Sequence, residues 1–273
     1  MADQSRIRGY TCKCTIGFDG DNCQVDVCDN HDCQNGTCVA DHSKIRGYTC
    51  NCTIGFDGDN CQDKKRCDNC IEYVKNNSWI LAFKAQSQTG INPVDVYKSV
   101  GIRHEVNRSY PLECTALKQI PGCFMPYRTG LIDDWEEINV NRVKFQVIID
   151  DTNTQEVVFD GRTTDNINWF TASRILSSTW QDVTSDGQFN YFTLEGHQEN
   201  FVNRQFYISR EHAGCPNDKG WFASSFFPKI GCGFDNIGGK FPAFVACPKA
   251  THCVMESEAV NAQAIAIWIK FDN

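Results

Sequence analysis

Apolar and polar residues alternate over short stretches in most of the chain from about residue 76 onward. A period of two places successive side chains on opposite faces, which predicts β-strands. The clearest runs are VKFQVII (Val143–Ile149) and AIAIWIKF (Ala264–Phe271). Shorter runs of the same kind cover residues 80–85, 156–159, 189–194, 204–209, 221–227 and 243–246.

Clusters of Gly, Asn and Asp such as DDTNT, SDGQ and DNIGGK separate these runs and predict turns. The best helical pattern is the short stretch RTGLIDDWEEI (Arg128–Ile138). Residues 76–273 are numerous enough to bury a sizeable core. We therefore predict one mainly β domain there, a two-layer sandwich or jelly roll.

The N-terminal part follows a different pattern, an internal repeat. IRGYTCKCTIGFDGDNCQ begins at Ile7 and IRGYTCNCTIGFDGDNCQ begins at Ile45, so the offset is 38 residues. We call residues 7–24 the first copy and residues 45–62 the second copy. They differ only where Lys13 in one corresponds to Asn51 in the other.

Six cysteines in residues 25–62 have a spacing that resembles an EGF-like module. They are separated by four, four, eleven, one and eight residues, with a QNGTC turn at Gln34–Cys38 and a GFDGDNC ending. Spacing alone leaves fifteen pairings open. The resemblance implies the bridges Cys28–Cys38, Cys33–Cys50 and Cys52–Cys61. Because a module of about forty residues has almost no core, each bridge should contribute ~2–4 kcal/mol.

Residues 1–24 match only the C-terminal half of such a module. Cys12, Cys14 and Cys23 correspond to its last three cysteines, so Cys14 and Cys23 can pair while the partner of Cys12 would lie upstream. This accounts for the odd total of 17 cysteines. We interpret the segment as part of a longer array. The alternative is that Cys12 is a free thiol for crosslinking between chains.

The charged stretch QDKKR (Gln62–Arg66) leads into a predicted linker, residues 63–75, that contains the pair Cys67 and Cys70. Together with the six later cysteines, this pair completes a set of eight that can all be bridged. Proximity along the chain suggests Cys114–Cys123, Cys215–Cys232 and Cys247–Cys253.

A bridged framework needs an oxidising compartment, so we expect a secreted, extracellular protein. The polar start MADQS does not resemble a signal peptide, and an export signal is expected upstream. No apolar run approaches the ~20 residues that span a bilayer. Candidate glycosylation sites are Asn35, Asn51, Asn76 and Asn107.

Calcium is the metal that the EGF resemblance implies, because calcium-binding modules supply clustered oxygen ligands around the first and third cysteines. Gln24 lies four residues before Cys28, Asp26 follows, and Asp41 lies shortly after Cys38. Val27, directly before Cys28, departs from the acidic residue expected there. The implied ligands are Gln24, Asp26 and Asp41; the alternative is an ordinary module with a solvated acidic surface.

Enzymatic and nucleic-acid functions find little support in the sequence. The six histidines lack metal-ligand spacing, and no GxSxG is present. Asp133, Asp134, Glu136 and Glu137 are expected to form the charged face of a short helix. A formal charge of −8 argues against nucleic acid as a partner. We expect no catalytic residues.

Carbohydrate binding by the β domain is an alternative. Sugar sites combine aromatic rings with Asn, Asp and Arg, and DNINWF (Asp165–Phe170) and CPNDKGWF (Cys215–Phe222) supply such residues. However, tryptophans beside apolar runs are usually part of a core, and four are of this kind: Trp169, Trp180, Trp221 and Trp268.

The tracts WFTASRILSSTW and RQFYISREHAGCPNDKGWF resemble an extracellular β domain of secreted invertebrate proteins that often accompanies EGF-like modules. The whole arrangement is similar to that of scallop byssal (attachment-thread) proteins with tandem calcium-binding EGF-like modules. This resemblance implies a structural or adhesive protein that associates with itself or with other matrix or thread proteins. The alternative is a lectin-like head on an EGF stalk, with glycans as partners.

Overall fold

The computed structural model describes residues 13–29, 31–41, 43–52, 56–64, 74–107, 109–199, 202–226, 231–236 and 239–271. The chain forms two compact units, Met1–Asp68 and Asn69–Asn273. Antiparallel strands dominate both, which confirms the mainly β fold class. Cys12, Cys67 and Cys70, three cysteines of the predicted framework, lie outside the described residues.

The N-terminal unit contains three two-stranded antiparallel sheets. Strand β3 (Gly36–Ala40) pairs with β4 (Tyr48–Cys52) and sets Cys38 opposite Cys50. On either side of this hairpin, β1 (Phe18–Asp19) pairs with β2 (Val25–Asp26), and β5 (Phe56–Asp57) pairs with β6 (Asp63–Lys64). The chain after Gln24 thus folds back onto the first copy.

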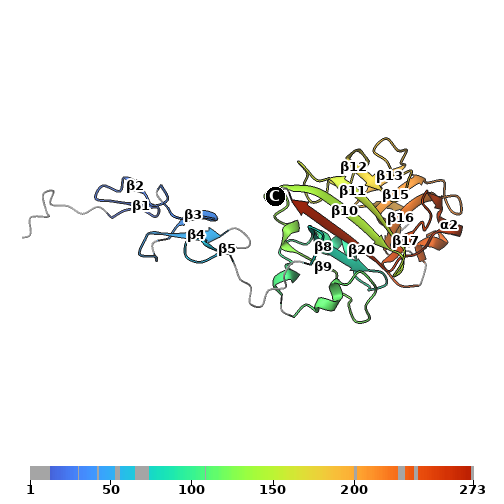
Figure 1. The fold of residues 1–273 in the computed structure, drawn as a ribbon, viewed down its shortest axis with the longest axis horizontal. Coiled ribbons are helices and arrows are strands. Elements are labelled where there is room, and N and C mark those ends of the chain that lie inside the picture. Colours follow the sequence, from blue (N-terminus) through green and yellow to red (C-terminus); the bar gives the residue numbers. More distant parts are fainter. Residues whose placement is uncertain are drawn as a thin grey trace, which may run out of the picture. The chain divides into compact units, whose positions relative to one another are not determined.

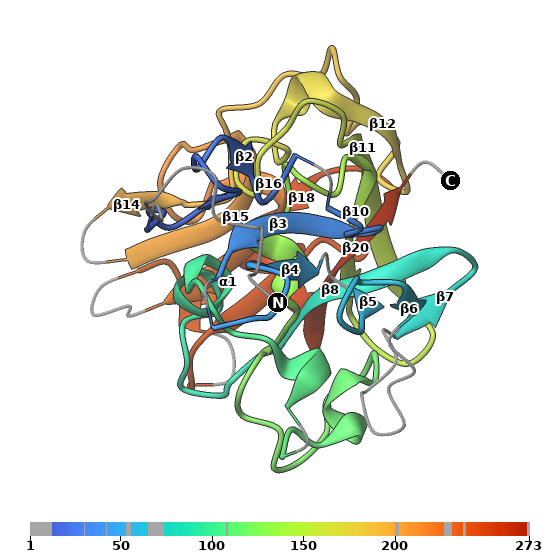
Figure 2. The same ribbon diagram turned by 90° about the vertical axis from the view of Figure 1, so that its left-hand side faces the viewer.

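The first sheet of the C-terminal unit has the strand order β12-β11-β10-β20-β8-β7, with β9 paired to β8. Figure 1 shows β20, the last strand of the chain, between β10 and β8, and Figure 2 shows β12, β11 and β10 in succession. The strands are β7 (Lys75–Asn76), β8 (Trp79–Gln86), β9 (Tyr127–Arg128), β10 (Val140–Ile148), β11 (Thr154–Asp160), β12 (Ile175–Ser178) and β20 (Ala264–Phe271).

The second sheet has the order β13-β15-β16-β17-β19, with β14 paired to β15 and β18 paired to β16. Each of the eight predicted runs overlaps a strand of one of the two sheets. The strands are β13 (Tyr191–Thr193), β14 (His197–Glu199), β15 (Val202–Glu211), β16 (Lys219–Phe226), β17 (Ala243–Ala246), β18 (Cys253–Val254) and β19 (Val260–Asn261).

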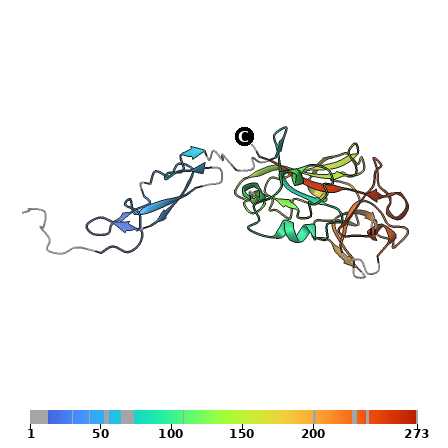
Figure 3. The same ribbon diagram turned by 90° about the horizontal axis from the view of Figure 1, so that it is seen from below.

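The two larger sheets form a sandwich with an aromatic core. In Figure 3 the orange strands of the second sheet gather on one side of the green and red strands of the first. Phe145 on β10 stacks on Phe206 on β15, with ring centroids 5.5 Å apart, and meets Phe222 on β16 edge-on at 5.4 Å. All four tryptophans expected in the core are buried.

Helices are few and short: α1 (Pro93–Lys98), α2 (Met255–Glu258) and the 3₁₀ turns η1 (His104–Val106), η2 (Leu112–Thr115), η3 (Gly130–Ile132), η4 (Ala172–Arg174) and η5 (Gly233–Asn236). The start of α1 carries a signal that the sequence analysis missed. Asn92 caps the helix by accepting from the backbone N–H of Val94, and Pro93 fills the first turn.

The predicted helix at Arg128–Ile138 is wrong. Arg128 belongs to β9, and only Gly130–Ile132 forms a 3₁₀ turn. The buried Arg128 guanidinium donates to the carbonyl of Tyr97 and, at 2.6 Å, to Asp133 Oδ1. This buried contact holds the segment in a tight turn, so Asp133 is a structural partner rather than part of a solvated helix face.

Lys84 is a buried cation on β8. Its ammonium donates to Gln86 Oε1 at 2.9 Å and to the carbonyl of Lys118 at 3.3 Å, and Gln86 in turn accepts from the N–H of Ile120. These contacts fix the disulfide-closed segment around Lys118 and Ile120 onto the sheet. Burial lowers the pKa of Lys84 to about 8.

We expect this shift to make the free energy of unfolding depend on pH. Because the folded-state pKa is below the unfolded value of 10.5, the unfolded chain binds more protons between about pH 8 and 10.5. Lys84 should therefore contribute up to ~3 kcal/mol of added stability as the pH rises through this window. Denaturant unfolding of the wild type and of Lys84→Met should show the rise only in the wild type; identical slopes would contradict it.

Candidate functional site

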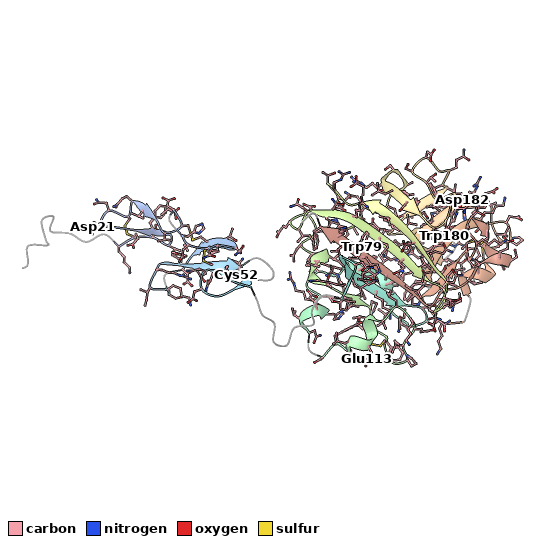
Figure 4. The ribbon with its side chains drawn as sticks, viewed as in Figure 1. Asp21, Cys52, Trp79, Glu113, Trp180 and Asp182 are labelled. Carbon is pink, nitrogen blue, oxygen red and sulfur yellow. A yellow bond between two sulfur atoms is a disulfide. The ribbon has the colours of Figure 1, made fainter. Side chains whose placement is uncertain are left out.

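The repeated DGDN segment forms the same turn in both copies. Gly20 and Gly58 have φ angles of 88° and 90°, in the left-handed region that favours glycine. Each glycine carbonyl accepts from a cysteine three residues later, Cys23 at 2.9 Å and Cys61 at 3.1 Å. Figure 4 labels Asp21 in the first of these turns. The repeated DGDN sequence therefore forms the same tight turn beside an equivalent disulfide in each copy.

The candidate calcium ligands each bond to their own local backbone. Gln24 Oε1 accepts from the N–H of Asn22 at 2.9 Å, and Asp26 Oδ1 accepts from the N–H of Cys28 at 2.8 Å. Asp41 Oδ1 accepts from the N–H and hydroxyl of Ser43. Within the described ranges, no group of three or more His, Cys, Asp or Glu residues is arranged to hold a metal ion. Calcium binding by these residues stays a prediction.

Val27 has a packing role at the position where the resemblance calls for an acid. A Cβ placed on Gly47 would lie 3.1 Å from Val27 Cγ1. The Val27 side chain therefore packs against Gly47, in the turn between β3 and β4. A second contact brings Gly17 of the first copy close to Ala40. Val27 therefore links the two copies: its side chain packs on Gly47, and its N–H donates to the carbonyl of Gly17 at 3.0 Å.

An open groove of about 1030 Å³ runs along this joint, which we call the seam. It has three exposed or half-exposed apolar side chains: Ile16 is 75% exposed, Phe18 is 43% exposed, and Ile45 is fully exposed. Lys13 and Lys44 add positive charge at its edge.

Seven disulfides connect described cysteines, and they are the pairs expected above: Cys14–Cys23, Cys28–Cys38, Cys33–Cys50, Cys52–Cys61, Cys114–Cys123, Cys215–Cys232 and Cys247–Cys253. They indicate an oxidising environment. Among the described residues, no helix has the length and apolar character needed to cross a membrane.

The four candidate glycosylation sites differ in accessibility. Asn35 is half-buried and its amide nitrogen donates to the carbonyl of Cys61 at 3.0 Å. Asn51 on β4, Asn76 on β7 and Asn107 are exposed. Because Asn35 uses the nitrogen that a glycan would modify, glycosylation stays a prediction that now favours the other three sites.

The two stretches proposed for sugar binding have different surroundings. In CPNDKGWF, Trp221 is buried and donates to Asp182 Oδ1, and Asp218 is buried as well. In DNINWF, Trp169 is buried, but Asp165 and Asn168 border a recess of about 360 Å³. The second stretch therefore contributes two polar side chains to this recess.

We call this recess the polar cleft. Its floor includes Trp135 and Val140, and its polar lining consists of Glu136, Asn139, Thr163, Thr164, Asp165 and Asn168. The residues come from the turn before β10 and the turn after β11, which the β10–β11 pairing brings together. Glu136 was expected on a helix face and Asn139 was not singled out, because nothing local in the sequence links either residue to Asp165.

A half-buried carboxylate–imidazole pair was also missed. Asp182 Oδ2 lies 2.6 Å from His252 Nδ1, while Oδ1 accepts from the Trp221 indole at 2.7 Å. Burial alone would raise the pKa of Asp182, but the hydrogen bonds from His252 and Trp221 outweigh it and hold that pKa below its usual range. Figure 4 shows Asp182 near Trp180, in the loop after β12. The pair ties this loop to the segment before β18.

Comparisons with protein-family models, curated proteins and solved structures found no match to this chain.

Proposed function

We propose that this chain is an extracellular structural or adhesive protein. EGF-like modules act as disulfide-bridged spacers, and the C-terminal β sandwich acts as a docking head. The observation that carries the proposal is the recurrence of one bridged turn at a 38-residue offset: Phe18 faces Asp26 as Phe56 faces Lys64, each beside an equivalent disulfide. Near-identical units present the same surface each time, which suits a spacer. A module that recognises its own partner would need a contact surface that differs from that of its neighbours.

The seam supports the assembly part of the proposal. In a longer array it would recur at every joint, and its exposed Ile16, Phe18 and Ile45 give each joint an apolar surface. Contiguous exposed apolar surface commonly marks interaction sites. Partners would be further copies of the chain or other matrix or thread proteins. Calcium bound by Gln24, Asp26 and Asp41 would stiffen the joint.

We expect the sedimentation coefficient of the disulfide-intact chain to increase with protein concentration. The measurement uses a Cys12→Ser background, so that a crosslink through this thiol cannot mimic assembly. Ile16→Ser combined with Ile45→Ser should reduce the increase, because it removes apolar surface from the seam. Val100→Ser, an exposed apolar position in the other unit, is the matched control.

The outcomes separate assembly from calcium binding. A monomer at every concentration, with saturating calcium and with EDTA, would refute assembly. Equal association in calcium and EDTA would remove only the calcium part. If calcium does promote association, Asp26→Asn with Asp41→Asn should abolish that dependence.

A further inference from the structure

We infer that the polar cleft of the C-terminal domain binds a neutral saccharide through one hexose-sized unit. This deepens the docking role proposed above and rests on it. The inference names the chemistry that the docking head recognises, which the repeat and the seam leave open.

The fold builds the cleft where the β10–β11 hairpin opens. Arg142 faces Asp160 at this end, and the N–H of Gly161 donates to the carbonyl of Asn141 at 2.8 Å. A Cβ on Gly161 would lie 2.8 Å from Val140 Cγ1, so glycine is needed for this close approach. The two turns that line the cleft are therefore held together by strand pairing.

The floor of the cleft is apolar and fixed. Trp135 is only 2% exposed, and its indole N–H donates to Thr164 Oγ1 at 3.0 Å. Thr164 in turn donates to the carbonyl of Gly161 at 2.6 Å, and Trp135 stacks on Trp169 with centroids 6.2 Å apart. Val140 completes this floor. Because Trp135 and Val140 are almost fully buried, they close the bottom of the cleft, and the polar rim supplies the groups that contact a ligand.

The rim supplies oriented hydrogen-bonding groups. Asp165 Oδ1 accepts from the N–H groups of Ile167 and Asn168 at 2.8 and 2.7 Å, and Oδ2 accepts from the Asn168 amide at 2.9 Å. These bonds fix the carboxylate while leaving acceptor capacity, since an ionised carboxylate has about four lone-pair sites. Across the cleft, Glu136 and Asn139 are exposed.

Carboxylate and carboxamide groups together match the hydroxyls of a sugar. A hydroxyl donates one hydrogen bond and accepts others, so it can donate to Glu136 or Asp165 and accept from the amide of Asn139. Neighbouring hydroxyls of one ring present such groups side by side. A cleft of about 360 Å³ lies at the small end of ligand pockets, which suits a single ring.

The charge of the lining selects among saccharides. Two of its residues, Glu136 and Asp165, carry carboxylates, and its described residues include no Lys, Arg or His. An acidic sugar would bring a third negative charge beside these two carboxylates, and like charges brought together disfavour binding. The cleft should therefore prefer neutral sugars to uronic or sialic acids.

The test is isothermal titration of the full chain with cellobiose, maltose, lactose and diacetylchitobiose, and with sialyllactose as the acidic probe. At least one neutral probe should bind more tightly than sialyllactose. Glu136→Ala and Asn139→Gly should each weaken that binding about tenfold. Glycine suits position 139 because Asn139 has a φ of 49°. Glu137→Ala, an exposed neighbour outside the lining, is the control and should bind as the wild type does.

Failure to bind any of the four neutral disaccharides would overturn the inference, as would equal affinity in the wild type and both cleft variants. Circular dichroism of each variant verifies that the sheets are intact. The sedimentation experiment is independent of this one. A chain that assembles without binding sugar would refute the inference alone, while a monomer that binds sugar would refute only the assembly part of the proposed function.

Discussion

Breaking the Cys33–Cys50 bridge is expected to unfold the N-terminal unit while the C-terminal sandwich keeps its structure. Tyr48 and Cys61 are the only buried apolar residues described in the N-terminal unit. Its three sheets have two strands each, and isolated two-stranded sheets are at best marginally stable. Removal of a native disulfide from such a unit typically costs 2–5 kcal/mol, which exceeds what this small core can supply.

Hydrogen exchange of the full-length Cys33→Ser, Cys50→Ser variant would measure this effect. The amides of β3 and β4 should lose protection, while those of β10 and β20 should exchange as in the wild type. Cys114→Ser with Cys123→Ser is the matched control, because that bridge closes a loop beside a large core and its loss should remain local. Protected β3 and β4 amides in the first variant would show that the hairpin is stable without its bridge.

The strands of the sandwich were predictable because their signal is local. Runs such as Val143–Ile149 and Ala264–Phe271 repeat with a period of two and end at turn residues, so each carries its own evidence. The order of strands was not predictable. β20 lies between β8 and β10 because it pairs across more than a hundred residues, and no local pattern encodes that pairing.

The error at Arg128–Ile138 has the same origin. Its helical spacing is genuine, but Arg128 is drawn into the interior by the carbonyls of Tyr97 and Ile102, which the sequence places far away. Tertiary contacts of this kind override a short local preference. By contrast, Asn92 and Pro93 gave a capping signal for α1 that lies within a few residues, and applying it would have found this helix.

Only half of the polar cleft could be read from the sequence. Asp165 and Asn168 were singled out because they occur beside Trp169, although that ring proved to belong to the core. Glu136 and Asn139 lie about thirty residues earlier and reach the cleft through the β10–β11 pairing. The local sequence therefore identified the Asp165 and Asn168 side of the cleft. It did not identify the side formed by Glu136 and Asn139.

Replacing Asp235 with alanine is expected to destabilise the C-terminal domain by about 3–5 kcal/mol, the typical cost of leaving one partner of a buried ion pair uncompensated. Arg204 on β15 is 4% exposed and Asp235 is fully buried. The guanidinium donates from Nε and one terminal nitrogen to the two carboxylate oxygens, at 2.9 and 2.7 Å. Asp235 also accepts from the hydroxyl of Ser225 and the N–H of Cys232, so the substitution removes the acceptor for four donors.

A double-mutant cycle can separate the buried charge from the rest of this loss. Arg204→Met combined with Asp235→Ala should be less destabilising than the sum of the two single changes, because the double variant leaves no isolated charge in the core. Glu195→Ala, which breaks the exposed pair with Lys98, should cost only ~0–1 kcal/mol. Denaturant unfolding followed by tryptophan fluorescence gives all of these values. If the two single losses of stability simply add up in the double variant, Arg204 and Asp235 stabilise the domain independently. Packing of Arg204 on Phe234, rather than charge pairing, would then hold this end of the second sheet together.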